Sequence, residues 1–92
     1  MSRVATAELV IRNELGLHAR SATALVQLAT RYEAELWLSN DEREVNGKSI
    51  MGVLLLMAGK GTRIRARAEG PDAPELITAL TALVENKFGE GS

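Results

Sequence analysis

The chain contains a single histidine, which stands in the stretch NELGLHARSA, residues 13–22. His18 follows Gly16 by two residues, and Arg20 comes two residues later. An imidazole offers a nitrogen nucleophile at neutral pH, and a guanidinium offers a permanently charged fork for phosphate oxygens. A lone histidine before a helix is more often a loop or capping residue, and an arginine in a first turn is more often a solvated charge. The pair nevertheless favours a histidine that carries a phosphoryl group.

A helix is expected directly after His18, because the hydrophobic period changes there. Four apolar residues recur at helical spacing within residues 19–32, namely Ala22, Leu25, Val26 and Ala29. A helix start leaves backbone N–H groups free and carries the positive end of the helix dipole. We therefore expect the N–H groups of Ala19, Arg20 and Ser21 to form an anion site beside His18.

A second candidate site is Ser49, which precedes the apolar run IMGVLLLMA, residues 50–58. Its position predicts a helix N-cap, and a phosphate at the same place is compatible with the helix dipole. The helix that follows is apolar on almost every side, and so short a chain has little interior to bury it. We therefore expect Ile50, Met51 and Leu54 to form an exposed docking patch beside His18.

The remaining elements follow from alternating and helical patterns. Strands are expected at residues 4–12, 35–39, 42–45 and 62–68, and Gly59-Lys60-Gly61 is expected to end the second helix. Asp72 and Glu75 predict a capping box for a last helix. The order βαββαβα indicates an α+β fold, an antiparallel sheet with helices on one face. A ferredoxin-like split βαβ unit is the nearest alternative topology.

Length and composition narrow the classes of protein further. The 92 residues suit one domain, 1–92, and there is no cysteine, which together with a single histidine excludes the common zinc sites. We expect no metal and no cofactor. The longest apolar run, 50–58, is too short to span a bilayer, and no signal peptide is evident, so we expect a cytoplasmic protein that does not insert into membranes.

A nucleic-acid partner is not expected either. The formal net charge is −1, and only 3% of the residues are aromatic. Arg63, Arg65 and Arg67 alternate along one expected strand, and we interpret them as a solvated sheet face. An RNA- or ligand-binding domain of the ferredoxin type stays as an alternative that leaves the histidine motif unexplained.

The histidine motif resembles the active-site signature of the HPr family, the histidine-containing phosphocarriers of the bacterial phosphoenolpyruvate-dependent phosphotransferase system. V-N-G-K-S-I-M-G-V-L, residues 45–54, resembles the regulatory-serine segment of the same family, and the spacing of the two motifs agrees. The resemblance also includes the A-G-K-G turn, residues 58–61, and covers nearly the whole chain. It implies an open-faced β-sandwich, a four-stranded antiparallel sheet with three helices on one face.

The resemblance also implies roles for individual residues. Nδ1 of His18 accepts a phosphoryl group from phosphorylated Enzyme I and passes it to an enzyme II A-type domain, while Arg20 binds phosphate oxygens. Such proteins are carriers rather than turnover enzymes, and we expect a monomer. In many bacteria an HPr kinase/phosphorylase modifies the serine that matches Ser49. A regulatory binding module of the same fold, acting through Ser49 phosphorylation alone, is the alternative, although related proteins of that kind lack the histidine.

One position departs from the signature, because most members of the family have proline where this chain has Ser21. Serine loses the rigidity of proline and adds an N–H and a hydroxyl near the expected phosphate. We expect restored proline to be tolerated or mildly stabilising. The sequence does not name the terminal acceptor, which belongs either to a sugar-transport branch or to a nitrogen-related regulatory branch.

Overall fold

Four strands form one antiparallel sheet in the computed structural model, which describes residues 3–92. The predicted domain therefore includes two residues, 1–2, that lie outside the described part. In chain order the strands are β1 (Arg3–Val10), β2 (Glu35–Ser39), β3 (Glu44–Asn46) and β4 (Arg63–Gly70). Their order in the sheet is β1-β4-β2-β3, so the first and last strands of the chain pair side by side.

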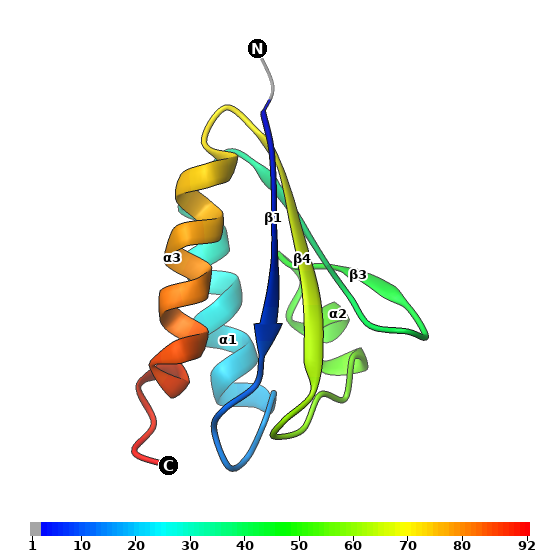
Figure 1. The fold of residues 1–92 in the computed structure, drawn as a ribbon, viewed down its shortest axis with the longest axis vertical. Coiled ribbons are helices and arrows are strands. Elements are labelled where there is room, and N and C mark those ends of the chain that lie inside the picture. Colours follow the sequence, from blue (N-terminus) through cyan, green and yellow to red (C-terminus); the bar gives the residue numbers. More distant parts are fainter. Residues whose placement is uncertain (1–2) are drawn as a thin grey trace.

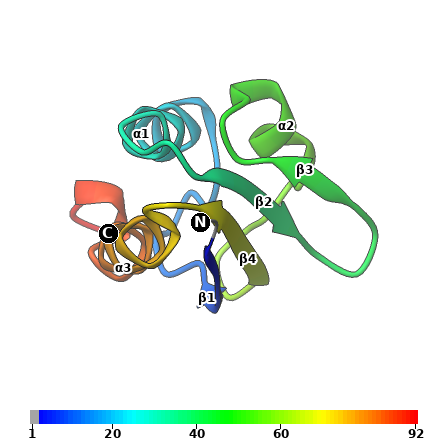
Figure 2. The same ribbon diagram turned by 90° about the horizontal axis from the view of Figure 1, so that it is seen from above.

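Three α-helices lie on the same side of this sheet, as Figure 2 shows. They are α1 (Ala19–Ala29), α2 (Ile50–Leu55) and α3 (Ala73–Glu85), and a short 3-10 turn, η1 (Lys87–Gly89), follows α3. This arrangement is the open-faced sandwich with the order βαββαβα, so the expected fold class is confirmed.

Alternation along the strands determines which side chains meet the helices. Ile64, Ala66 and Ala68 of β4 are buried, and the arginines between them point to the other face. The expected apolar stripe of α1 is buried as well, which leaves its opposite side in solvent. The core therefore lies between one face of the sheet and the helices, and the other face is open.

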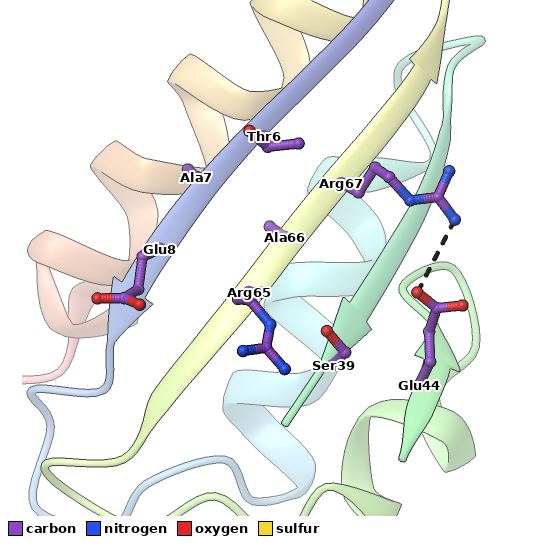
Figure 3. A pocket seen from close by; sticks show the side chains of 8 residues that line it. All are labelled: Thr6, Ala7, Glu8, Ser39, Glu44, Arg65, Ala66 and Arg67. Carbon is purple, nitrogen blue, oxygen red and sulfur yellow. Dashed lines mark ion pairs between the residues drawn. The ribbon is translucent and has the colours of Figure 1, made fainter. Parts of the chain in front are cut away.

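The open face is a set of ion pairs rather than a free cationic surface. Arg63 lies 3.5 Å from Glu8, and Arg67 lies 3.8 Å from Glu44 and 3.4 Å from Glu69. The Arg67 guanidinium also sits 4.5 Å from the centre of the Trp37 ring. Figure 3 shows Arg65 and Arg67 of β4 on this face between Glu8 of β1 and Glu44 of β3. Carboxylates therefore lie close to the arginines of β4, as is expected on a solvated face of a sheet.

Two predicted helix ends are wrong. The helix predicted for residues 50–58 ends at Leu55, and Met57 adopts a left-handed φ of 51°, so the glycines at 59 and 61 do not terminate it. The chain leaves the helix early because Ala58 accepts a backbone hydrogen bond of 2.8 Å from Leu17. The first helix ends at Ala29 rather than at residue 32, and a turn follows.

The predicted capping box of α3 is also wrong. Asp72 is the N-cap residue, but its side chain makes no bond to the helix. The carboxylate instead accepts hydrogen bonds from the backbone N–H groups of Glu33, at 2.9 Å, and Ala34, at 2.8 Å. Asp72 therefore connects two chain segments that are far apart in sequence, and it does not cap its own helix.

Strand bounds differ slightly from the prediction. The return strand occupies Glu44–Asn46, because Asn40 uses its side-chain oxygen to accept from the N–H groups of Glu42 and Arg43 and so forms the turn. β1 ends at Val10, two residues earlier than expected, and β4 continues to Gly70. None of the helices in the described residues is long and apolar enough to cross a membrane.

The loop before α1 and the C-terminal segment lie at the same end of the molecule (Figure 1). α3 runs in the same direction as β1 in that view, opposite to β4, and returns the chain to the end of the molecule where β1 ends. The fold therefore brings the C-terminal residues next to the segment that carries His18.

Candidate functional site

A glycine contact holds the loop that carries His18. Gly16 has a φ of +67°, and a Cβ at this position would lie 2.5 Å from the carbonyl oxygen of Ala58. Leu17 donates its N–H to the same oxygen. Only glycine permits both the left-handed backbone and the close approach. The loop therefore lies directly against the segment that follows α2.

His18 is the N-cap residue of α1, with an extended backbone. Its Nδ1 accepts from the backbone N–H of Arg20 at 3.4 Å, a long and weak contact. Its Nε2 lies 2.8 Å from Oε2 of Glu90. Because a backbone N–H can only donate, Nδ1 presents its lone pair, and in the neutral ring the proton belongs on Nε2. The ring is partly open to solvent, with 31% of the side chain exposed.

Glu90 is held from its other side by Asn13. Nδ2 of Asn13 donates to Oε1 of Glu90 at 2.9 Å and to the carbonyl oxygen of Gly16 at 2.8 Å. The hydrogen bond from Asn13, then that from His18, lowers the pKa of the Glu90 carboxyl below its ordinary value. Glu90 is therefore an anion at neutral pH, next to Nε2 of His18.

Ser21, in the first turn of α1, bonds the loop that carries His18 through its side chain. The residue is completely buried. Its hydroxyl donates to the carbonyl oxygen of Gly16 at 2.9 Å and accepts from the N–H of His18 at 2.9 Å. The hydroxyl is thus occupied in holding the loop, whereas Ala19 and Arg20 of the same turn are exposed residues.

Arg20 is exposed in the first turn of α1. Within residues 3–92, no carboxylate lies within ion-pair distance of its guanidinium. Together with Ala19 it lines a shallow hollow on the outer side of α1, which continues along Thr23, Ala24 and Gln27. The guanidinium is therefore free to bind an incoming anion next to His18.

Ser49 caps α2 as predicted. Its Oγ accepts from the N–H of Gly52 at 3.1 Å. Lys48, the residue before it, donates its ammonium to the carbonyl oxygen of Tyr32 at 2.8 Å, which ties the start of α2 to the turn after α1. The cap is needed because α2 has only six residues and few internal hydrogen bonds.

The apolar surface around α2 lacks one residue of the predicted patch and includes two others. Ile50 and Met51 are exposed, with 77% of Met51 in solvent, but Leu54 is partly buried against the core. Leu55 and Met57 are exposed in its place, Met57 to 85%. We call Ile50, Met51, Leu55 and Met57 the α2 apolar patch.

Two residues of the site were not predicted as functional. Asn13 belongs to the histidine motif, and an asparagine before a glycine turn is ordinarily explained by the turn alone. Glu90 lies 72 residues from His18, and no local pattern indicates the contact. Among the described residues, no group of three or more metal-ligating side chains is found.

Comparison with known proteins shows the family of this chain. The family model described as "PTS HPr component phosphorylation site" matches residues 5–86. The chain belongs to the HPr family. It is a phosphocarrier of the phosphotransferase system, and the sequence resemblance to that family is confirmed.

Individual relatives agree over most of their length. A phosphocarrier protein HPr of Xylella fastidiosa is 49% identical over 90% of this chain and 93% of that protein. A phosphocarrier protein HPr of Neisseria meningitidis is 46% identical over 88% of this chain and 91% of that protein. The crystal structure of HPr-C-His from Thermoanaerobacter tengcongensis superposes with a TM-score of 0.91 at 41% identity, covering 96% of this chain and 99% of that one.

Proposed function

We propose that Nδ1 of His18 accepts a phosphoryl group from phosphorylated Enzyme I and passes it to an enzyme II A-type domain. The observation that carries this proposal is the orientation of the ring. Nε2 is bonded to Glu90, and Nδ1 faces the start of α1 with its lone pair available. Only the weak contact from the N–H of Arg20 must be released before Nδ1 reacts.

The groups around Nδ1 suit a transferred phosphoryl group. The lone pair of Nδ1 forms a bond to phosphorus while the bond from phosphorus to the donor breaks, and the donor keeps that electron pair. The phosphoryl oxygens then face the first-turn N–H groups of α1, at the positive end of the helix dipole. The guanidinium of Arg20, which has no carboxylate partner within residues 3–92, can bind them as a charge-assisted donor. Catalysis of this kind consists mainly of positioning and charge stabilisation.

Partner docking is proposed for the α2 apolar patch. The His18 loop packs against residues 58 and 59, directly after the patch, so one partner surface can cover both. Met and aliphatic side chains adapt to several partners, which suits a carrier that must meet both a donor and an acceptor. Exposed apolar side chains grouped on one short helix are also typical of an interaction surface.

We further propose that a kinase of the HPr kinase/phosphorylase type regulates the carrier by phosphorylating Ser49. The hydroxyl lies at the edge of the α2 apolar patch, next to Ile50. A phosphate of charge about −2 there would have to be desolvated when a partner covers the patch. Because the oxygen would still accept from the N–H of Gly52, the fold would be kept.

The phosphocarrier proposal is tested by incubating the protein with Enzyme I and labelled phosphoenolpyruvate. The label should be acid-labile, as phosphohistidine is, and it should be absent from His18→Ala, whose circular dichroism should stay unchanged. The imidazole can be removed without unfolding the protein because it lies at the surface rather than in the core. Normal labelling of His18→Ala would contradict the proposal. Acid-stable label alone would favour the module that acts only through Ser49.

A further inference from the structure

The C-terminal segment reaches back to the ring of His18. Oε2 of Glu90 lies 2.8 Å from Nε2, and only 14% of the Glu90 side chain is exposed. We propose that Glu90 is a positioning residue for phosphoryl transfer, which keeps the proton on Nε2 and balances the positive charge that the ring acquires when Nδ1 is phosphorylated. This inference rests on the proposed role of His18.

Asn13 holds the Glu90 carboxylate at the oxygen that His18 does not contact. The amide of Asn13 is completely buried and directs Nδ2 to two acceptors, the carbonyl oxygen of Gly16 and Oε1 of Glu90. Its own Oδ1 has no partner within the described residues. A buried oxygen without a partner is costly, so Asn13 serves this site through its N–H groups, and one of them orients Glu90.

The backbone that delivers Glu90 is strained. Lys87 and Phe88 are consecutive non-glycine residues with left-handed φ values of 54° and 57°. Such conformations persist only where the surrounding structure imposes them. Here the Phe88 side chain is buried in the core, and Glu90 donates its N–H to the carbonyl oxygen of Lys87 at 2.9 Å. Phe88 therefore anchors the tail, and the tight turn places the carboxylate against His18.

The charge balance gives this contact a chemical purpose. When the lone pair of Nδ1 bonds to phosphorus, the donor leaves with its electron pair, and the proton stays on Nε2. The ring therefore becomes cationic as the bond forms, and it becomes neutral again when the phosphoryl group leaves for the next acceptor and the electron pair of the N–P bond returns to Nδ1. The carboxylate of Glu90 is present in both steps and stabilises that charge. Arg20 acts at the opposite side, on the phosphoryl oxygens.

The test compares Glu90→Ala and Glu90→Gln with Glu85→Gln, a matched change of an exposed glutamate at the end of α3. Proton and nitrogen magnetic resonance of the unphosphorylated protein should show a His18 Nε2–H signal that is protected from exchange with water. The signal should persist in Glu85→Gln and disappear in Glu90→Ala. Glu90→Gln retains an acceptor oxygen without charge and should keep part of the protection.

The second readout is the rate of labelling by Enzyme I and phosphoenolpyruvate. Glu90→Ala and Glu90→Gln should slow it by about three- to tenfold, the factor for the loss of one hydrogen bond, with thermal melting showing that both remain folded. A protected signal that survives in Glu90→Ala would overturn the inference. So would an unchanged labelling rate in both variants, because the contact would then be only structural. A wild-type protein that takes no label would instead refute the proposed function, before any variant is compared.

Discussion

The hydroxyl of Ser21 joins two backbone groups of the loop that carries His18. It accepts from the N–H of His18 and donates to the carbonyl oxygen of Gly16. A proline at this position offers neither bond, although its ring suits the first turn of a helix. The structure therefore changes the expectation for the proline variant, because the serine side chain has bonds to lose.

Ser21→Pro should lower the stability of this protein. The two lost hydrogen bonds are worth about 0.5–1.5 kcal/mol each, and the stiffer unfolded chain recovers about 0.4–1 kcal/mol. The net loss should be about 1 kcal/mol, which lowers Tm by roughly 4–8 °C in a domain of this size. Thermal melting measures it, with Ser21→Ala as the control that loses the same bonds without the proline ring. A proline variant that melts above the wild type would contradict this account.

Arg20→Ala should slow phosphoryl transfer without changing stability. A charge-assisted hydrogen bond to phosphate is worth roughly 1.5–3 kcal/mol, so the labelling rate should fall by about tenfold or more. Tm should stay the same because the guanidinium is exposed and has no carboxylate partner in residues 3–92. Arg20→Lys keeps the charge but not the planar fork, so its labelling rate should lie between those of the wild type and Arg20→Ala. Equal rates for all three proteins would leave Arg20 as a solvated charge.

At the scale of one element, α2 depends on its cap. A helix of six residues has few internal hydrogen bonds, and Ser49 supplies a bond to the N–H of Gly52. Aspartate and asparagine cap helices about as well as serine. The charge of a substituent at position 49 can therefore be varied without removing the cap.

Ser49→Asp should lower the apparent affinity for Enzyme I, and Ser49→Asn should not. Both side chains keep an acceptor for Gly52, so both variants should melt close to the wild type. Only aspartate places a negative charge at the edge of the α2 apolar patch, where a partner must exclude water. Initial labelling rates at varied carrier concentration give the apparent affinity. Equal affinities of the two variants would show that charge at Ser49 does not control docking.

At the scale of the whole molecule, Asp72 joins the start of α3 to the segment between α1 and β2. The backbone hydrogen bond from Glu33, followed by that from Ala34, lowers the pKa of the Asp72 carboxyl below its ordinary value. A carboxyl with a lowered pKa in the folded state stabilises the protein above its unfolded pKa. That stabilisation is lost as the pH falls through the folded pKa.

Asp72→Asn should therefore lower Tm at neutral pH. An asparagine has one acceptor oxygen, and its NH₂ group cannot accept from the second N–H. The difference in Tm from the wild type should begin to shrink below about pH 4, where the unfolded chain takes up a proton at Asp72, and should become small once the pH has fallen through the lower pKa of the folded carboxyl. Melting curves at several pH values measure this. A difference that is independent of pH would show that the Asp72 charge does not hold these segments together.

Local patterns determined much of the fold. Alternation along β4 predicted its buried alanines and its outward arginines, since successive side chains of a strand point to opposite faces. Helical spacing predicted the buried side of α1 in the same way. His18 and Ser49 were predicted at helix starts, because capping depends on residues next to each other in the chain.

Contacts between distant segments were decided only by the tertiary structure. The pairing of β1 with β4 brings the end of α3 to the His18 loop, and this places Glu90 against Nε2 across 72 residues. The early end of α2 and the bonds of Asp72 have the same origin, since Ala58 and Asp72 each bond a segment far away in sequence. Hydrogen-bonding capacity is visible in a sequence, but the partner that satisfies it depends on which loops the sheet order brings together. The proposed nucleophile could therefore be predicted from the sequence, whereas the carboxylate that contacts it is found only in the fold.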